Sequence, residues 1–331
     1  MNKKTTIQDI ANLAGVAKST VSRYLNNGYV SKEKATLIDK VIRETGYKSN
    51  FFAKRLKTKE SKLIGIVMPR LDSFSAGKIL TGFNAILEQA GYQALILISD
   101  LDSNKELANI AQLIEQGVDG IIVDSINITD KHLQLLQQTT IPIIFTGQSH
   151  DDVTFIKVAD FSAGKMMGKY IASLQHRQVA FVGVAPDDIA VGQDRYNGFK
   201  EGFLAHNQSG KISFIEADFS FDKAYSLGET VMQIQPSAII CATDNIALGI
   251  LRYLHEHDVA VPQSVSVAGF GGYPVGNITY PSLTSLAFDY QSLGETTAQK
   301  LLAMLQGESV QSKFDNNLNL IIRESTARCT K

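Results

Sequence analysis

Polar side chains near the start of the chain are spaced so that they would lie together on one helix face. The stretch GVAKSTVSRYLNNG, residues 15–28, predicts a helix that begins after Gly15. Its apolar residues fall on one side of that helix: Val16, Val21, Tyr24 and Leu25. Its polar residues fall on the other side: Lys18, Ser19, Ser22, Arg23 and Asn26. Cationic, hydroxyl and amide groups in this pattern form either an ordinary solvated surface or a surface that binds a polar partner.

Charge is distributed unevenly along the 331 residues, whose formal net charge is only −1. Residues 1–62 contain 14 Lys and Arg against 5 Asp and Glu, a net charge of +9. The remaining residues contain 18 against 28, a net charge of −10. A small basic segment attached to a large acidic body indicates that the segment, and not the body, binds a polyanion such as a nucleic acid.

Three short helices are predicted to position the polar face. Thr6 would cap the first helix, with Asp9 as its acidic partner. The second would run over about 17–26, and the third, capped by Ser31, over about 32–45. Such a helix-turn-helix unit places its second helix in the major groove of DNA. The residues expected to pack inside it are Ile7, Ile10, Ala11, Ala14, Ala35, Ile38, Val41 and Ile42.

The segment TIQDIANLAGVAKSTVSRYLNN resembles the N-terminal signature of the LacI/GalR family of bacterial repressors, and the resemblance continues through the whole chain. It implies that Lys18, Ser19 and Arg23 contact bases, with Arg23 the candidate for guanine, because its planar fork can bond O6 and N7 together. The phosphate contacts that it implies are Thr6, Thr20, Ser22 and Asn26. Ala17 departs from the family, which often has a capping Ser there, at a cost of about 1 kcal/mol. The alternative is a helical hairpin whose polar face is merely solvated.

The basic segment NFFAKRLKTKES, residues 50–61, predicts a short helix that Asn50 would cap. As a free peptide it would be marginal, because one or two turns do not offset the cost of helix nucleation. It resembles the family's hinge helix, which orders on operator DNA and pairs with its twin in the minor groove. By position, Leu56 would be the wedge that opens the central base step, while Ala53 permits close approach beside the basic Lys54. The alternative for Leu56 is a linker residue that docks on the body.

Short apolar runs alternate with helix-like segments from residue 62 onward, which indicates an α/β fold. The runs predicted as strands are 63–68, 94–99, 120–125 and 142–147, followed by 179–184, 214–217, 238–243 and 265–270. We expect the strands of the first series to be buried. Continuous Val- and Ile-rich strands between helices are typical of parallel sheets covered on both faces, and two series indicate two doubly wound lobes. This is the architecture of the periplasmic sugar-binding proteins, which the LacI/GalR family shares.

The pattern also predicts where the domains begin and end. The expected domains are a helix-turn-helix domain at 1–48, a hinge and linker at 49–62, and an effector-binding and dimerisation domain at 63–331. The lobes would comprise about 63–157 with 289–319, and about 158–286 with 320–331, with crossings near 156–159, 286–289 and 320–323. The helix over 291–306 would then belong to the first lobe, and a closing strand over 319–327 to the second.

Ligands of doubly wound sheets bind beyond the carboxyl ends of the strands, here in the cleft between the lobes. The side chains offered there are Asp72, Ser73 and Phe74 after the first strand, Asp160 at a crossing, and Arg195, Phe219 and Asp244 in the second lobe. The resemblance implies that Arg195 and Asp244 bind the hydroxyls of an effector. It implies that Phe74 and Phe219 stack on a sugar ring. The alternatives are core packing for each Phe and a helix N-cap for Asp244, which can also carry a ligand.

The sequence departs from the family at GFGGYP, residues 269–274. Many sugar-responsive members have an acidic residue there, in a GFDD-like motif, whereas this chain has Gly271 and Gly272. The carboxylate that would grip hydroxyls is therefore absent, together with its charge. Two hypotheses remain open: a phosphorylated sugar, whose anion Arg195 could meet, and a neutral disaccharide that needs room beside the backbone.

Motifs of common enzymes and cofactor sites are missing. The sequence contains no GxxxxGK[ST], HExxH or GxSxG, and GFGGYPVG lacks the GxGxxG spacing. His255 and His257 would lie on different faces of a helix, which argues against a metal site. We therefore expect no enzyme activity and no cofactor.

Composition and the start of the chain favour the cytoplasm. Two cysteines, Cys241 and Cys329, do not make a disulfide framework, no apolar run approaches the roughly 18–20 residues of a membrane span, and no signal peptide is evident. The sequence predicts a transcriptional repressor of a sugar-utilisation operon: a homodimer, without a heptad tail, that a small sugar or sugar phosphate releases from a palindromic operator. The alternatives are a stand-alone sugar-binding protein, which would not need residues 1–62, and a regulator that responds to a non-sugar metabolite.

Overall fold

The chain folds as two compact units, Met1–Ser61 and Lys62–Lys331. The computed structural model describes residues 5–26, 28–47, 60–312, 314 and 317–330. The division falls one residue before the predicted start of the body.

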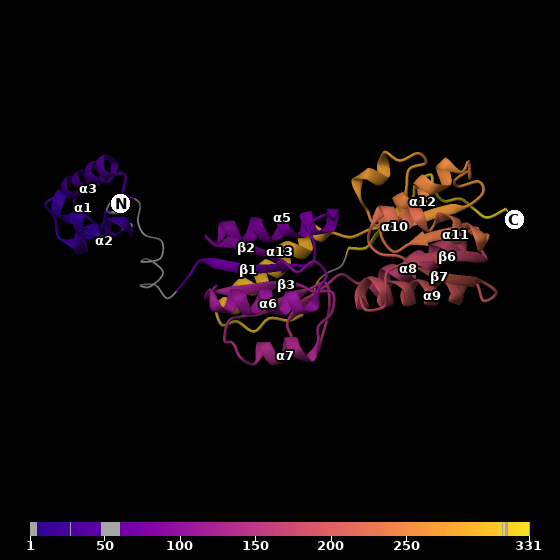
Figure 1. Ribbon diagram of the computed structural model, residues 1–331, viewed down its shortest axis with the longest axis horizontal. Helices are drawn as coiled ribbons and strands as arrows, with labels where there is room; N and C mark the ends of the chain where they lie inside the picture. Colours follow the sequence, from indigo (N-terminus) through magenta and orange to yellow (C-terminus); the bar gives the residue numbers. More distant parts are fainter. Residues whose placement is uncertain (1–4, 27, 48–59, 313, 315–316, 331) are drawn as a thin grey trace. The chain divides into compact units, whose positions relative to one another are not determined.

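The first unit is the predicted bundle of α1 (Ile7–Leu13), α2 (Lys18–Leu25) and α3 (Lys32–Thr45), drawn in indigo in Figure 1. Thr6 and Asp9 form the expected capping box: the Asp9 N–H donates to Thr6 Oγ1 at 3.3 Å, and the Thr6 N–H donates to Asp9 Oδ2 at 2.8 Å. Ser31 stands at the N-cap of α3, but within the described residues its side chain makes no capping hydrogen bond. The buried core is Ile10, Ala11, Ala14, Val21, Ile38 and Val41, while Ala35 and Ile42 are only half-buried.

The second unit contains the two predicted sheets. Among the described residues, one sheet has the strand order β2-β1-β3-β4-β5 and the other β11-β10-β9-β8-β6-β7. All neighbouring strands in them are parallel except β10 and β11. The first sheet is built from β1 (Leu63–Met68), β2 (Gln93–Ile98), β3 (Gly120–Asp124), β4 (Ile143–Thr146) and β5 (Phe155–Ile156). The second is built from β6 (Gln178–Gly183), β7 (Lys211–Glu216), β8 (Ala238–Cys241), β9 (Ser266–Gly271), β10 (Thr284–Ala287) and β11 (Asn319–Ile321).

Helices cover both faces of each sheet, as the apolar strands require. In the first lobe α5 and α13 lie on one face and α6 and α7 on the other; in the second lobe α10 and α12 lie opposite α8 and α9 (Figure 1). The helices of the first lobe are α5 (Phe74–Gln89), α6 (Ser103–Glu115), α7 (Asp130–Leu136) and α13 (Tyr290–Leu305). Those of the second are α8 (Asp160–Ser173), α9 (Arg195–His206), α10 (Phe221–Ser226), α11 (Gly228–Gln233) and α12 (Asp244–Glu256). The short helices η1 (Ile189–Asp194, π-type) and η2 (Pro274–Asn277, 3-10) complete it.

The chain crosses between the lobes near the predicted positions. The sheet of the first lobe ends with β5, and α8 then begins the second lobe at Asp160. The chain returns after β10, because α13 packs against α5, and it crosses again to pair β11 with β10. The helix α13 therefore packs in the first lobe, and the last strand pairs in the second.

The structure corrects three features of the predicted strands. The strand predicted as buried at 94–99 is β2, an edge strand whose Ile96 is 41% exposed, because it has a neighbour on one side only. The strand predicted at 214–217 begins earlier, at Lys211. The closing strand predicted over 319–327 is regular only over Asn319–Ile321, although the Ser325 N–H still donates to the Ser282 carbonyl.

Candidate DNA-binding face and effector cavity

The polar side of α2 points away from the bundle core. Val21 on its inner side is completely buried, whereas Lys18, Ser19 and Arg23 are exposed. Three further predicted contacts differ in exposure: Asn26 is exposed, and Thr20 and Ser22 are half-buried. Thr6, the remaining predicted phosphate contact in this unit, is exposed beside the start of α1. The fold therefore holds cationic and hydroxyl groups of α2 out from its core together.

Arg23 is supported by the turn that follows α2. The Gly28 N–H donates to the Arg23 carbonyl at 2.8 Å, and a Cβ at residue 28 would lie 2.7 Å from Arg23 Cγ. Glycine at this position therefore leaves room for the aliphatic stem of the arginine. The next residue, Tyr29, is 89% exposed and was not among the predicted contacts, because nothing in the helical pattern includes it.

The predicted hinge contacts lie outside the described residues: Asn50, Ala53, Lys54 and Leu56.

A cavity of about 330 Å³ lies between the two lobes of the second unit. This volume is in the range of small-molecule sites. The predicted effector residues that line it are Asp72, Ser73, Phe74, Asp160, Arg195 and Phe219. They come from the β1–α5 loop, the start of α8, the start of α9 and the loop after β7, so strand ends and crossings meet here as predicted.

Aromatic side chains from both lobes form walls of the cavity. Phe74, the first residue of α5, packs its ring against Tyr273 of the second lobe, with centroids 5.0 Å apart. Ser73 caps α5 by accepting a hydrogen bond from the Ala76 N–H at 3.1 Å. The guanidinium of Arg70 lies over the Phe219 ring at 5.6 Å, and its Nε donates to Asp72 at 2.5 Å. These contacts give flat apolar surfaces of the kind on which a sugar ring can stack.

Arg195 is buried, with 3% of its surface exposed, and is paired with Asp160. Its Nε donates to Asp160 Oδ1 at 3.1 Å, its Nη2 contacts the same oxygen, and its Nη1 donates to the Ala242 carbonyl. The guanidinium lies 5.1 Å from the rings of both Phe270 and Phe288. Burial disfavours the cation, but Asp160, with smaller effects of Tyr290 and Asp188, holds the pKa of Arg195 above its usual value. Most of the hydrogen-bonding capacity of Arg195 is thus used inside the protein.

Asp244 is directed at a loop and is not among the described residues that line the cavity. Thr243, and not Asp244, is the N-cap of α12. The Asp244 carboxylate accepts hydrogen bonds from the Tyr273 N–H and the Ser285 hydroxyl, each at 2.6 Å. Burial raises the pKa of Asp244 to about 6, although both hydrogen bonds act to lower it. In this structure Asp244 therefore positions Tyr273.

The two glycines of GFGGYP are required by the backbone and by neighbouring side chains. Gly271 and Gly272 have φ of +133° and +68°, which side chains rarely adopt. A Cβ at Gly271 would lie 2.5 Å from the Tyr273 ring, and one at Gly272 would lie 2.4 Å from the Ala287 Cβ. A side chain at Gly271 would meet Tyr273, so the glycines do not simply enlarge the cavity.

A group of oxygen-bearing side chains at the cavity was missed by the sequence analysis: Asp124, Ser125, Gln148 and Asp188. Burial, together with the charges of Glu106 and Asp188, raises the pKa of Asp124 to about 7. Burial also raises the pKa of Asp188. Asp124 ends β3 and Gln148 follows β4, so the strand-end rule that found Phe74 would have found both.

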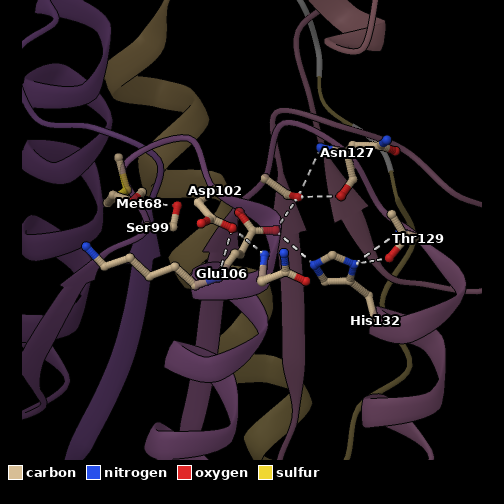
Figure 2. Close-up of polar contacts among 10 residues, drawn as sticks. Met68, Ser99, Asp102, Glu106, Asn127, Thr129 and His132 are labelled. Atoms are coloured by element: carbon tan, nitrogen blue, oxygen red, sulfur yellow. Dashed lines mark hydrogen bonds and ion pairs between the residues drawn. The ribbon is translucent and has the colours of Figure 1, made fainter.

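A buried network in the first lobe joins Ser125 to Glu106 and His132, and Figure 2 shows Glu106, His132 and Thr129 of this network. Glu106 Oε1 accepts hydrogen bonds from Ser125 Oγ at 2.7 Å and from His132 Nε2 at 2.9 Å. The Thr129 N–H donates to His132 Nδ1 at 3.1 Å. Since Nδ1 accepts, the ring hydrogen is on Nε2 and the imidazole is neutral. Both groups that donate to Glu106 Oε1 in this network are therefore neutral.

Among the residues that the structure describes, no group of three or more His, Cys, Asp or Glu is arranged to hold a metal ion. No helix of that part of the chain is long and apolar enough to cross a membrane.

Both units match known protein families. Residues 169–326 match the periplasmic binding protein-like domain, and residues 6–50 match the bacterial regulatory proteins of the lacI family. The chain is 35% identical over 310 residues to the sucrose operon repressor of Staphylococcus xylosus, covering 93% of this chain and 96% of that protein. It is 25% identical to the ribose operon repressor of Halalkalibacterium halodurans, covering 97% of each.

Solved structures share the fold. A lac repressor dimer bound to operator and the anti-inducer ONPF superposes with a TM-score of 0.89 at 24% identity, covering 98% of this chain and 100% of that one. A complex of the transcriptional regulator CelR with cellobiose gives a TM-score of 0.73 at 23% identity, covering 97% and 99%.

A helix-turn-helix unit followed by a two-lobed body with a cavity defines a class of ligand-responsive regulators. The chain belongs to the lacI family of bacterial regulatory proteins.

Proposed function

We propose that this protein is a transcriptional repressor of a sugar-utilisation operon, which a small sugar-like effector releases from its operator. The observation that carries the proposal is the presence in one chain of an exposed basic helix face and a cavity of ligand size. We further propose that its role is regulatory and not enzymatic, and that it binds DNA in the cytoplasm.

The DNA contacts are assigned to the polar side of α2. Lys18, Ser19 and Arg23 are exposed, and α2 is the second helix of a helix-turn-helix unit, the one that enters the major groove. A homodimer would present two such helices to the half-sites of a palindrome. Arg23 is assigned to a guanine because its guanidinium can donate to O6 and N7 together.

The effector is assigned to the cavity between the lobes. Phe74 and Phe219 supply apolar surfaces, and the carboxylates and amides around them supply hydrogen-bond acceptors. A ligand that contacts both lobes changes their relative orientation, which we propose is transmitted through residues 49–62 to the DNA-binding unit. Both a free sugar and a sugar phosphate are compatible with this general role.

The proposal is tested by selecting DNA that the full-length protein binds from a random library. Enrichment of a palindrome, followed by its release on addition of sucrose or ribose, is the expected result. Failure to enrich any sequence would contradict a repressor and favour a stand-alone binding protein. Release only by compounds other than sugars would favour a regulator of a different metabolite.

Arg23→Ala should weaken binding to the selected palindrome by about 1–3 kcal/mol and relax the preference at one base position per half-site. The matched control is Arg43→Ala, since Arg43 is also exposed but lies near the end of α3, paired with Asp39. Equal effects of the two substitutions on affinity and on sequence preference would remove Arg23 from the interface. Fluorescence anisotropy with labelled duplexes measures both.

A further inference from the structure

We propose that the cavity selects an effector group that donates hydrogen bonds and carries no negative charge, so that a free sugar binds and its phosphate ester is rejected. The selecting surface is made of Asp124, Ser125, Gln148 and Asp188, which we call the acceptor wall. The inference rests on the proposed function, because it concerns the effector of that same cavity.

Gln148 shows that the acceptor wall is incomplete without a ligand. Only 3% of its surface is exposed, and its Nε2 donates to Asp188 Oδ1 at 3.1 Å. Its Oε1 has no hydrogen-bond partner within the described part of the chain. A buried carbonyl oxygen without a partner is costly, and a donor on the effector would satisfy it.

The other members of the wall also offer oxygen lone pairs. The Ser125 hydroxyl gives its hydrogen to Glu106 Oε1, and its oxygen accepts from the Asn127 N–H at 3.3 Å, which leaves one lone pair for a further donor. Asp188 already accepts from the Val191 N–H at 2.9 Å as well as from Gln148. Asp124 lies beside Gly147, where a Cβ would come within 2.8 Å of its Oδ1, so glycine lets the carboxylate approach the loop after β4. The acceptor wall is therefore complementary to hydroxyl or amino groups of an effector, which donate hydrogen bonds.

The two arginines among the described residues that line the cavity are each already bonded to a carboxylate outside the acceptor wall. Arg195 is bonded to Asp160, and Arg70 is bonded to Asp72. Behind the wall stands Glu106, whose neighbour His132 is neutral by its hydrogen-bond geometry. A phosphate group placed against Asp124 and Asp188 would be repelled by the ionised form of each carboxylate, at low effective dielectric constant.

The test titrates the full-length protein with sucrose, sucrose 6-phosphate, fructose and fructose 6-phosphate by isothermal titration calorimetry. We expect a free sugar to bind at least about tenfold more tightly than its phosphate ester. A phosphate ester that binds as tightly as the free sugar, or more tightly, would overturn the inference and leave the proposed function intact. Binding of none of the four, with no effect of any on operator binding, would contradict the sugar effector itself and the inference with it.

Substitutions assign the selectivity to the wall. Asp124→Asn keeps the shape and removes a negative charge, so the preference for the free sugar over its phosphate ester should fall severalfold. Gln148→Leu removes the unpartnered oxygen and should weaken binding of the free sugar about tenfold. Asp124→Asn tests the charge of the wall, and Gln148→Leu tests its unpartnered acceptor. If one variant fails to fold, the other therefore still tests the proposal.

The matched control is Asp151→Asn, which makes the same charge change at an exposed residue of the first lobe. It should leave the preference unchanged. An equal loss of preference in Asp151→Asn and Asp124→Asn would show that overall charge, and not the wall, excludes the phosphate ester.

Discussion

The pair of Arg195 and Asp160 joins the start of α9 to the residue at which the chain enters the second lobe. Because both side chains are buried, neither charge has water to replace its partner. Removing one partner should therefore cost far more than removing a partner from an exposed pair.

Asp160→Ala should lower the free energy of unfolding by about 3–5 kcal/mol, since it leaves the Arg195 charge buried and unpaired. The control is Lys165→Ala in the same helix, whose ion pair with Glu201 is about half exposed on each side and should contribute at most about 1 kcal/mol. Urea unfolding followed by circular dichroism measures both. Similar losses from the two substitutions would mean that the buried pair does not hold this helix start.

Effector affinity should depend on pH through Asp124. Its pKa of about 7 in the free cavity means that it is largely protonated at pH 6 and largely ionised at pH 8. An effector that donates to the carboxylate stabilises the ionised form, so its binding lowers the pKa and its affinity rises as the pH rises through 7. Calorimetry from pH 6 to 8 with a free sugar should show this rise, and Asp124→Asn should flatten it. An affinity that falls with rising pH would mean that Asp124 binds as a donor.

Individual site residues were predictable where they follow an apolar strand. Phe74, Arg195 and Phe219 follow predicted strands and do line the cavity. Asp244 follows one too, yet its carboxylate turns to Ser285, a residue 41 positions away, and no local pattern encodes that contact. The sequence alone therefore does not distinguish a residue that contacts the ligand from one that positions another residue, whereas the three-dimensional structure does.

At the scale of elements, the loop between β9 and η2 shows how a short segment sets one wall of the cavity. The Asp244 carboxylate accepts a hydrogen bond from the N–H of Tyr273 in this loop, and the Ser285 hydroxyl accepts one from the Gly272 N–H at 2.9 Å. These bonds hold Tyr273 against Phe74, across the cavity between the lobes.

Gly272→Ala should destabilise the protein more than Gly91→Ala. Both positions have positive φ, +68° and +74°, so each substitution carries a conformational cost of about 1–2 kcal/mol. Only at Gly272 would the added methyl group meet another atom, the Ala287 Cβ, which should add about 1–3 kcal/mol. Thermal unfolding compares the two, and effector affinity should fall only for Gly272→Ala. Equal stabilities would show that the loop relaxes freely and does not fix Tyr273.

Elements were predictable to the extent that their signals are local. Caps and apolar periodicity located α1, α2 and α3, and apolar runs located the central strands. The exposure of β2 was not predictable from its own apolar residues, because it follows from the strand order of the sheet. The short strands β5 and β10 were not predicted for a related reason: a few residues carry too little periodicity.

For the whole molecule, the proposed function requires that effector binding in the cavity changes the free energy of operator binding at the DNA-binding face. The fold class and the two lobes could be predicted from the alternation of strands and helices. The coupling could not, because no sequence pattern in one unit indicates how that unit responds to a ligand of the other. Coupling between two ligands is reciprocal, so an effector that weakens operator binding must itself bind less tightly to the operator complex, by the same factor.

The measurement that tests this most directly is a pair of titrations of the full-length protein, with the selected operator and with a free sugar that binds the cavity. Operator affinity is measured with and without saturating sugar, and sugar affinity with and without saturating operator. We predict that each affinity falls by one common factor, within the roughly 5–150-fold typical of allosteric coupling. A sugar that binds the cavity without changing operator affinity would contradict the account.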